Sequence, residues 1–328
     1  MVKMKPKVYV TRQIPDEVLA IIRQTCEVRV WPEGDVPGPR DVLEREITDV
    51  EGLYCLLTDQ VDEALLERAP RLKIVSNMAA GYNNIDVEAA TRRGIMVTNT
   101  PDVLTETTAD LTFALLMATA RRLLEASEYL RSGEWRTWSP MLLTGQDVFG
   151  STLGIIGMGR IGEALVRRAK GFNMNVLYYN RTRKPETEEA YGIRYTDMKE
   201  LLSMSDFVCV MIPYSPQTHD LIGAVELRRM KPTAVLINTA RGGIVNEDAL
   251  YEALRDGIIW AAGLDVFEHE PVVPDHPLLT LPNLVSLPHI GSASVATRMK
   301  MASLAANHLI DAIGGHRPAH LVNPIVWE

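Results

Sequence analysis

The sequence contains few cysteines and no long apolar run, and each shortage excludes a class of protein. Three cysteines in 328 residues, an odd and scattered set, exclude a secreted domain held together by disulfides and favour reduced thiols in the cytoplasm. No apolar segment reaches the length of a membrane span, about 20 residues, or, at the N-terminus, that of a signal peptide. We therefore expect a cytoplasmic protein that does not bind membranes, with mostly buried thiols at Cys26, Cys55 and Cys209.

A surplus of positive charge is also missing. With 34 Lys and Arg residues against 42 Asp and Glu residues, the net charge is −8, which disfavours a general surface for nucleic acid or acidic lipid. Any anion-binding site must therefore be local. The apolar fraction of 46% is that of an ordinary globular protein, and the length suggests about two domains.

What is present, over most of the chain, is an alternation of short apolar runs with helical patterns. This alternation is typical of the α/β class, in which helices cover a parallel sheet. In the first hundred residues, strands are predicted at 7–10, 28–31, 53–57, 74–78 and 96–99, with helices near 17–24, 62–68 and 86–93. From Thr152 onward, six strands, the number that a Rossmann domain requires, are predicted at 153–157, 176–179, 207–212, 235–239, 261–266 and 285–287.

Two long helices complete the predicted fold. One is expected from Thr105 past Leu124, and it is so apolar on all sides that we predict burial between domains or subunits. The other, at 293–313, is expected to return to the first domain. The prediction is therefore two doubly wound parallel-sheet domains, a flavodoxin-like domain of residues 1–101 and 292–328 and a Rossmann domain of residues 102–291, with a ligand-binding cleft between them.

The first strand of the Rossmann region ends in a glycine-rich turn that reads Gly157-Met158-Gly159-Arg160-Ile161-Gly162. Its three glycines suit a tight turn, a close approach of the backbone to a pyrophosphate, and close packing of a helix on the strand. The N–H groups in the first turn of that helix are free to bind phosphates. Glycine-rich turns also serve structure alone, so the flanking strand and helix are what favour dinucleotide binding.

The next predicted strand is followed by Asn180-Arg181-Thr182-Arg183, where an NAD-binding chain places an acidic residue for the ribose 2′-hydroxyl. A carboxylate would repel a 2′-phosphate, whereas two guanidinium groups and a hydroxyl can bind it. The sequence therefore predicts NADP(H) as the preferred cofactor, with NAD(H) as the alternative. The competing interpretation is that the two arginines are solvated loop charges.

Polar side chains at the ends of later strands are candidates for chemistry. Arg241 follows the strand at 235–239 and can hold a carboxylate or polarise a carbonyl. His289 follows the strand at 285–287 and can act as a general acid, while the other six histidines are interpreted as structural. No metal is predicted, because the cluster Glu268, His269, Glu270 and His276 lacks H-E-x-x-H or comparable spacing.

Small residues follow the predicted strand at 74–78. The backbone N–H groups of Ala80 and Gly81 could form a nest for a carboxylate, although a simple turn at Gly81 explains the segment equally well. Leu56, at the end of the strand at 53–57, is a candidate border for the opposite end of a substrate.

Taken together, these segments resemble the D-isomer-specific 2-hydroxyacid dehydrogenases over nearly the whole chain, and most closely the glyoxylate and hydroxypyruvate reductase branch. The resemblance rests on residues 80–86, 106–110, 157–162, 239–242, 265–271 and 288–292. It implies a catalytic trio of Arg241, Glu270 and His289, and it selects Glu270 over Glu268, which spacing alone leaves open. In the implied reaction, His289 protonates the carbonyl oxygen of a 2-oxo acid, Arg241 binds the carboxylate, and Glu270 stabilises the imidazolium.

The same resemblance implies the remaining contacts. The flavodoxin-like domain would bind the substrate, and Ala80 and Gly81 would complete the carboxylate site. Residues 105–145 would form a dimerisation segment in which Trp138 reaches the partner's cleft, unless Trp135 and Trp138 simply fill the subunit interface. The cofactor set would also include Thr108, Thr239, Ala240, Asp265 and Gly291.

The sequence thus predicts a homodimeric, NADPH-preferring reductase that converts glyoxylate, hydroxypyruvate and 2-ketogluconate to D-2-hydroxy acids. Two alternatives stay open, namely a dinucleotide-sensing protein like the corepressors built on this fold, and another family member such as 3-phosphoglycerate dehydrogenase. Formate is disfavoured as a substrate, because formate dehydrogenases of this superfamily carry glutamine where this chain has Glu270. No nucleic-acid partner is expected.

Overall fold

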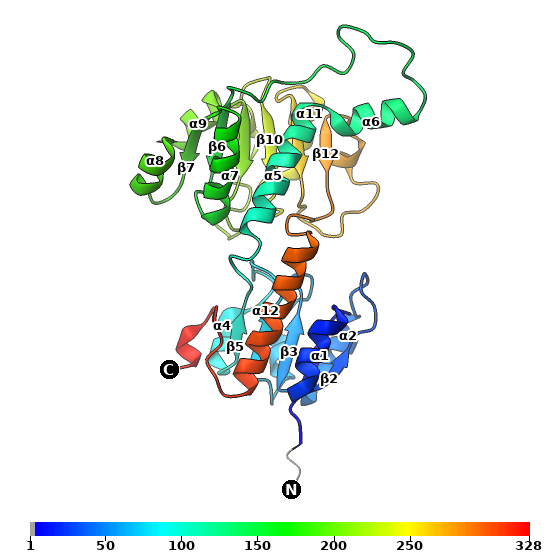
Figure 1. The fold of residues 1–328 in the computed structure, drawn as a ribbon, viewed down its shortest axis with the longest axis vertical. Helices are drawn as coiled ribbons and strands as arrows, with labels where there is room; N and C mark the ends of the chain where they lie inside the picture. Colours follow the sequence, from blue (N-terminus) through cyan, green and yellow to red (C-terminus); the bar gives the residue numbers. More distant parts are fainter. Residues whose placement is uncertain (1–3) are drawn as a thin grey trace. The chain divides into compact units, whose positions relative to one another are not determined.

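A computed structural model describes residues 4–328, which form two compact units (Figure 1). Unit 1 comprises residues 4–104 and Ala293–Glu328, and unit 2 comprises Thr105–Ser292. The limits expected from the sequence, after residues 101 and 291, lie within a few residues of these. Residues 1–3, part of the segment in which no signal peptide is expected, lie outside the described residues.

Unit 1 contains a five-stranded parallel sheet in the order β2-β1-β3-β4-β5, which is the flavodoxin-like order. The central strand β3 and its neighbour β4 are buried along their whole length, as expected for a sheet covered by helices on both faces. The strands are β1 (Lys7–Val10), β2 (Glu27–Val30), β3 (Gly52–Cys55), β4 (Ile74–Asn77) and β5 (Met96–Thr98). The α/β class and the doubly wound topology predicted for this region are confirmed.

The helices of unit 1 connect and cover these strands. The last long helix, α12, lies against β3 and β4, where Tyr54 Oη donates to Ala302 O at 3.2 Å and Ser76 Oγ donates to Ala305 O at 2.7 Å. The helices are α1 (Asp16–Thr25), α2 (Arg40–Glu46), α3 (Glu63–Glu67), α4 (Val87–Arg92) and α12 (Val295–Ile313), with short 3₁₀ turns η1 (Ile47–Asp49) and η3 (Pro324–Val326).

Unit 2 contains a seven-stranded parallel sheet in the order β12-β11-β10-β9-β6-β7-β8. Its first strand, β6, lies between β7 and β9, so the strand order reverses at β6, and open α/β sheets bind ligands at such a reversal. The strands are β6 (Thr152–Ile156), β7 (Asn175–Tyr179), β8 (Arg194–Tyr195), β9 (Phe207–Val210), β10 (Val235–Asn238), β11 (Ala261–Leu264) and β12 (Leu284–Ser286).

The prediction of six strands in this region was wrong by one. The missed strand, β8, has two residues, Arg194 and Tyr195, which pair with Leu177 and Tyr178 of β7. A two-residue edge strand that includes an ionised side chain has no apolar run, so hydrophobic patterning cannot detect it.

The long helix expected from Thr105 past Leu124 consists of two helices. The backbone of Arg122 is left-handed, with φ at 53°, and this residue separates α5 from α6. Burial of this helix was predicted between domains or subunits. The structure buries α5 within unit 2, where it packs against α7, β10 and β11. The helices are α5 (Thr105–Ala120), α6 (Leu123–Arg131), α7 (Arg160–Gly171), α8 (Pro185–Tyr191), α9 (Met198–Met204), α10 (Ala224–Leu227) and α11 (Glu247–Arg255), with the 3₁₀ turn η2 (Pro277–Thr280).

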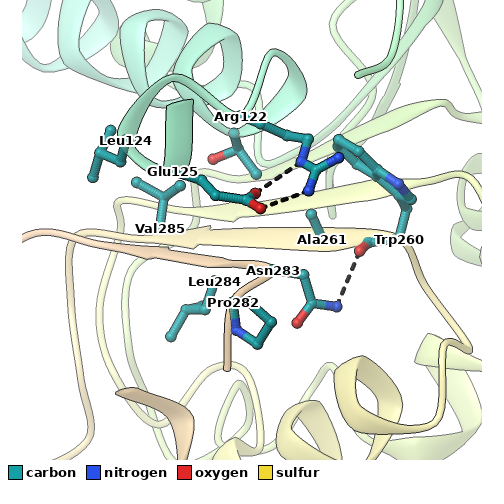
Figure 2. A pocket seen from close by; sticks show the side chains of 10 residues that line it. Arg122, Leu124, Glu125, Trp260, Ala261, Pro282, Asn283, Leu284 and Val285 are labelled. Atoms are coloured by element: carbon teal, nitrogen blue, oxygen red, sulfur yellow. Dashed lines mark hydrogen bonds and ion pairs between the residues drawn. The ribbon is translucent and has the colours of Figure 1, made fainter. Parts of the chain in front are cut away.

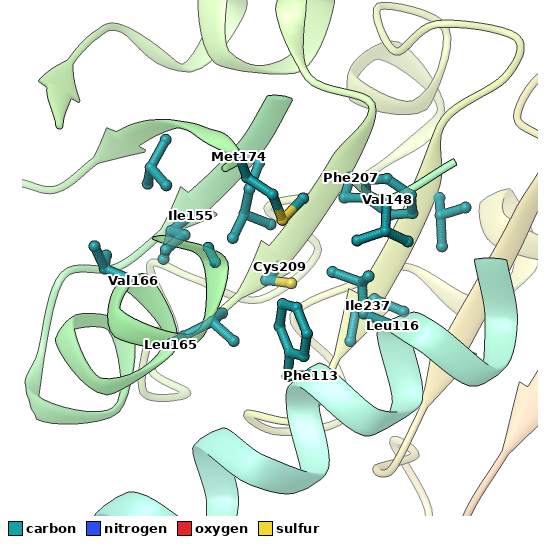
Figure 3. Packing of buried hydrophobic residues seen from close by; sticks show 14 of the residues in the cluster. Phe113, Leu116, Val148, Ile155, Leu165, Val166, Met174, Phe207, Cys209 and Ile237 are labelled. Atoms are coloured by element: carbon teal, nitrogen blue, oxygen red, sulfur yellow. The ribbon is translucent and has the colours of Figure 1, made fainter. Parts of the chain in front are cut away.

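A hydrophobic core joins α5 and α7 to the sheet of unit 2 (Figure 3). Phe113 and Leu116 of α5 and Leu165 of α7 pack over Cys209 and Ile237 of the central strands. Cys209, like Cys26 and Cys55, is a buried free thiol, and burial raises its pKa, so the sequence-based interpretation of the cysteines as buried is confirmed. Within residues 4–328, no helix is both long enough and apolar enough to span a bilayer.

Candidate active site

The glycine-rich turn connects β6 to α7 at the strand-order reversal, and two of its glycines are required by the backbone. Gly157 has φ at +103°, and a Cβ added there would lie 2.7 Å from Met211 O. A Cβ on Gly162 would lie 2.5 Å from Gly157 O, so this glycine allows α7 to pack against the turn. These two positions perform the turn and packing roles expected of a dinucleotide fingerprint.

Gly159 differs from these two because, within residues 4–328 and apart from its own chain neighbours, no atom lies within 4 Å of an added Cβ. The space in front of this residue is therefore open, and the first N–H groups of α7, for which Gly159 is the N-cap, lie beside it. An open space at a helix N-terminus at the carboxyl edge of the sheet suits a pyrophosphate. The turn thus fits a nicotinamide dinucleotide.

The segment after β7 presents the residues expected at the adenosine ribose. Asn180 Oδ1 accepts the N–H of Met158 at 3.4 Å, which ties the segment to the glycine-rich turn, and Asn180 Nδ2 donates to Thr182 O at 2.9 Å. Arg183 makes two contacts with Glu188, at 2.8 and 2.7 Å. Among residues 4–328, Arg181 has no such partner, so of these two arginines its guanidinium is the more available to an anion.

These contacts also stabilise the ionised form of Glu188. Hydrogen bonds from Arg183 and from Tyr178 Oη lower the pKa of Glu188 to about 2, and the carboxylate forms an ion pair with Arg183. From the sequence, Arg181 and Arg183 are equivalent candidates for binding a phosphate. In the folded chain they differ, because Glu188 already pairs with Arg183.

His289 and Glu270 form a hydrogen-bonded pair. His289 Nδ1 lies 2.6 Å from Glu270 Oε2, and Glu270 Oε1 accepts the N–H of Phe267 at 3.0 Å. Burial disfavours the charged form of Glu270, but the hydrogen bond and charge of His289, the Phe267 N–H and the charge of Arg241 outweigh it and lower the pKa of Glu270. The ionised carboxylate therefore accepts from Nδ1–H, which leaves Nε2 of the imidazole for another partner.

Asp265, just after β11, fixes the turn that carries His289. Its carboxylate accepts the N–H groups of Ile290 at 2.8 Å and Gly291 at 2.7 Å, and its carbonyl accepts the N–H of His289 at 2.9 Å. His289 has φ at 54°, a left-handed conformation that non-glycine residues seldom adopt and that clusters at functional sites. Burial raises the pKa of Asp265, against the opposing effect of the two N–H donors and of His289.

Three threonines link α5 to the end of β10. Thr112 Oγ1 donates to Thr108 O at 2.8 Å and lies 2.7 Å from Thr239 Oγ1. A Cβ added to Gly291 would lie 3.5 Å from Thr108 Cγ2 and 3.2 Å from Asp265 Oδ2. The structure therefore brings together Thr108, Asp265 and Gly291, which were predicted as cofactor contacts.

Arg241 follows β10 in the same unit. Its Nη1 donates to Ala240 O at 2.8 Å, while Asn238 Nδ2 donates to Arg241 O at 2.9 Å, so the backbone around it is fixed. Burial lowers the pKa of Arg241, and the charge of Glu270 opposes that effect. A Cβ on Gly242 would overlap Phe267 O, so the Arg241 segment lies directly against the segment that carries Glu270. The predicted trio is thus assembled on neighbouring strand ends of unit 2.

The acidic and histidine cluster considered for a metal is divided between two pairs. Glu270 contacts His289, whereas His276 Nε2 lies 3.2 Å from Glu247 Oε2. Within residues 4–328, no group of three or more His, Cys, Asp or Glu side chains could hold a metal ion.

In unit 1, the predicted substrate residues are held by asparagines that sequence reasoning missed. Asn99 Nδ2 donates to Ala80 O at 2.6 Å, and Asn77 Nδ2 donates to Gly81 O at 2.9 Å. In the part of the chain that the structure describes, no acceptor contacts the N–H groups of Ala80 and Gly81, as a carboxylate nest requires.

Asn84 connects this segment to Leu56. Its Nδ2 donates to Leu56 O at 3.1 Å and to Asp59 O at 3.0 Å, and its Oδ1 lies 3.4 Å from Asn77 Nδ2. The only sequence signal for this role is its place in the motif at 80–86.

A cavity of about 290 Å³ lies at the other edge of the unit 2 sheet (Figure 2). Trp260, Ala261, Asn283 and Leu284, at the amino ends of β11 and β12, line it together with the ion pair of Arg122 and Glu125. Because the glycine-rich turn and the trio follow the carboxyl ends of the strands, this cavity is not the dinucleotide site.

Comparison with known proteins agrees with this geometry. The protein-family model described as "D-isomer specific 2-hydroxyacid dehydrogenase, NAD binding domain" matches residues 113–291, which is more than half of the chain. The glyoxylate reductase of Korarchaeum cryptofilum is 51% identical over 321 residues, which cover 98% of this chain and 96% of that protein.

Two solved structures are similar over almost their whole length. The TT0316 protein of Thermus thermophilus is 43% identical, with a TM-score of 0.90, and the match covers 96% of this chain and 99% of that one. The NADPH-dependent glyoxylate/hydroxypyruvate reductase of Sinorhizobium meliloti, solved with NADP and malonate, is 36% identical, with a TM-score of 0.83 and 97% coverage of both chains. The chain therefore belongs to the D-isomer-specific 2-hydroxyacid dehydrogenases, a family of nicotinamide-dinucleotide-dependent oxidoreductases, and is close to the glyoxylate reductases within it.

Proposed function

We propose that this chain reduces small 2-oxo acids to D-2-hydroxy acids with NADPH as the preferred cofactor, glyoxylate and hydroxypyruvate being the first candidates and 2-ketogluconate the next. The observation that carries the proposal is the 2.6 Å contact between His289 Nδ1 and Glu270 Oε2 in the unit that bears the dinucleotide turn. The similarity to glyoxylate reductases supports the choice of substrate class.

The proposed reaction assigns one role to each residue of the trio. His289 holds a proton at Nε2 and delivers it to the carbonyl oxygen of the substrate, because Nδ1 is occupied by Glu270. Glu270 fixes the tautomer and favours the imidazolium through its charge. Arg241, whose guanidinium is largely buried, binds the substrate carboxylate and stabilises the negative charge that develops on the oxygen. The nicotinamide, when bound, supplies the hydride.

Further residues would bind the two ligands. The N–H groups of Ala80 and Gly81 are assigned to the substrate carboxylate and Leu56 to the far end of the substrate. Residues of the glycine-rich turn, Met158, Arg160 and Ile161 included, are assigned to the pyrophosphate. Thr108, Thr239, Ala240, Asp265 and Gly291 are assigned to the nicotinamide end.

The cofactor preference rests on the segment after β7. No acidic residue occupies positions 180–183, and Arg181 is unpaired among the described residues. We therefore assign the 2′-phosphate chiefly to Arg181, with Thr182 as a hydroxyl donor, while Arg183 contributes less because Glu188 already holds it.

A homodimer is proposed from the exposed apolar residues around α6. Leu130, Trp135, Trp138 and Met141 have exposed fractions of 58%, 56%, 76% and 75%, and no residue of α6 is buried. Such a surface favours a second copy of the chain as its cover. Light scattering of the purified protein at two concentrations tests this part, and a monomer at both would contradict it.

A panel of 2-oxo acids assayed with NADPH and NADH tests the proposed function. We expect turnover of glyoxylate and hydroxypyruvate, a higher kcat/KM with NADPH, and loss of turnover in His289→Asn. Tight dinucleotide binding without reduction of any 2-oxo acid would overturn the proposal and favour the sensing protein. Preference for a phosphorylated substrate would favour 3-phosphoglycerate dehydrogenase instead.

A further inference from the structure

A second carboxylate–imidazole pair lies beside the segment that carries Glu270. Glu247 is the first residue of α11, and its two oxygens make two different contacts. Oε1 accepts the N–H of Glu268 at 2.6 Å, and Oε2 lies 3.2 Å from His276 Nε2. Since Glu268 and His276 flank Glu270 in the sequence, one side chain holds the segment on both sides of the acid of the trio.

We call residues 265–276 the 265–276 loop. Asp265 attaches its start to the 289–291 turn and Glu270 pairs with His289, and the contacts of Glu247 attach the segment at Glu268 and at His276. Residues 268, 269, 271 and 273–275 are exposed, whereas the side chain of Glu270 is 25% exposed, Phe267 is buried and Val272 packs against the core of unit 2. The ring of His276 meets that of Phe267 edge-on, with centroids 5.9 Å apart. The Glu247–His276 pair therefore also supports Phe267, whose N–H binds Glu270.

The position of Glu247 at the start of a helix does not by itself explain these contacts. The N-terminus of α11 is already capped by Asn246, whose side chain accepts the N–H of Ala249 at 2.8 Å. The carboxylate of Glu247 is largely buried, with 15% of the side chain exposed, and it is directed at the loop. A buried carboxylate is costly unless it is well bonded, so its two loop contacts are what offset its burial.

We propose that Glu247 and His276 are positioning residues for Glu270, which hold the 265–276 loop so that the Glu270 carboxylate meets His289 Nδ1 in line. This inference rests on the proposed function of the trio. Neither residue touches substrate or cofactor in this role. Their effect passes through Glu268 and Phe267 to Glu270, and a displacement of about 1 Å at a catalytic group can cost up to about a hundredfold in rate.

The experiment compares Glu247→Ala, His276→Ala and the conservative Glu247→Gln, whose amide can still accept the Glu268 N–H. Glu226→Ala is the matched control, because Glu226 likewise accepts a backbone N–H, that of Gly223 at 3.2 Å, but belongs to the start of α10. For each protein, kcat and KM for glyoxylate, the pH profile of reduction, the Kd of NADPH and the thermal midpoint are measured. Hydrogen exchange of the Phe267 and Glu268 amides is followed as well.

We expect kcat to fall about tenfold or more in Glu247→Ala and His276→Ala, with the alkaline limb of the profile moved to lower pH. The Kd of NADPH should stay within about twofold of the wild-type value, and the Phe267 amide should exchange faster. Glu247→Gln should recover most of kcat, and Glu226→Ala should lower the thermal midpoint without changing kcat.

Unchanged kcat, pH profile and Phe267 exchange in Glu247→Ala and His276→Ala would overturn the inference, even where the thermal midpoint falls. If Glu247→Ala does not fold, Glu247→Gln and His276→Ala decide by the same criteria. Failure of the proposed function looks different, because the wild-type protein then reduces no 2-oxo acid while faster Phe267 exchange in Glu247→Ala still supports the positioning contact.

Discussion

Asp265 holds His289 in a left-handed backbone conformation. The N–H of His289 donates to Asp265 O at 2.9 Å, while the Asp265 carboxylate accepts the next two N–H groups of the turn. A positive φ at a non-glycine residue costs about 1 kcal/mol or more and persists only where its surroundings enforce it. The orientation of the imidazole therefore depends on the hydrogen bonds of Asp265 as well as on His289 itself.

Replacing Asp265 tests whether the turn that it holds orients His289 for reduction. In Asp265→Asn the amide keeps one acceptor but turns a donor toward the turn, so one of the two N–H groups loses its partner at a cost of about 1–3 kcal/mol. We expect a lower thermal midpoint and a fall of about tenfold or more in kcat with glyoxylate. Urea unfolding and steady-state kinetics measure the two effects. Wild-type kinetics in a destabilised Asp265→Asn would show that the turn does not orient His289 for reduction.

Glu270→Gln should change the pH dependence of reduction. The lowered pKa of Glu270 means that its carboxylate is charged throughout the neutral range, where it favours the protonated imidazole that reduction needs. Removing this charge should move the alkaline limb of the kcat/KM profile to lower pH and leave the Kd of NADPH unchanged. A profile that matches the wild type would exclude the assigned role. Glu268→Gln is the control. It removes an exposed carboxylate two positions before Glu270 and should leave the profile unchanged.

Much of this site could be predicted because its signals are local. The glycine-rich turn, the apolar strands and the polar residues after them are patterns of a few consecutive residues, and the strand-end rule then places Arg241 and His289 at one edge of a sheet. The pairing of His289 with Glu270, 19 residues earlier, came from the family resemblance and not from spacing.

The parts that could not be predicted depend on contacts between distant residues. β8 exists because Arg194 and Tyr195 pair with β7, and the break between α5 and α6 depends on one left-handed residue, Arg122. The Glu247–His276 pair joins positions 29 residues apart that share no motif, and the ion pair that distinguishes Arg183 from Arg181 needs the folded position of Glu188. Patterns of a few consecutive residues carry no information about such contacts between distant positions.

Arg181→Ala should weaken NADPH binding selectively. An exposed charge-assisted contact to a 2′-phosphate contributes roughly 1.5 kcal/mol, so the KM for NADPH should rise about tenfold while that for NADH stays constant. Arg183→Ala is the matched comparison and should have a smaller effect, because Glu188 already engages that guanidinium. Equal loss in the two variants, or loss with both cofactors, would contradict the assignment of the 2′-phosphate chiefly to Arg181.

His308, on α12 of unit 1, should make stability depend on pH. Its Nε2 lies 3.2 Å from His320 Nδ1, and burial, reinforced by His320, lowers its pKa to about 4 from an ordinary value of about 6.5. Above about pH 6.5 both the folded and the unfolded chain carry neutral His308, so this residue adds no pH dependence there. Between about pH 6.5 and 4 the unfolded chain binds a proton that the folded chain does not, so the free energy of unfolding falls as pH falls.

The size of this loss should be on the order of 1–2 kcal/mol, which is less than the full pKa difference implies because solvent screens part of it. Urea unfolding at pH 7.0, 6.0 and 5.0 should give a steeper decline in the wild-type protein than in His308→Gln, whatever the absolute stability of the variant. His316→Gln removes an exposed histidine from the same region and should keep the wild-type slope. Parallel slopes for wild type and His308→Gln would mean that His308 accepts a proton without unfolding the helix around it.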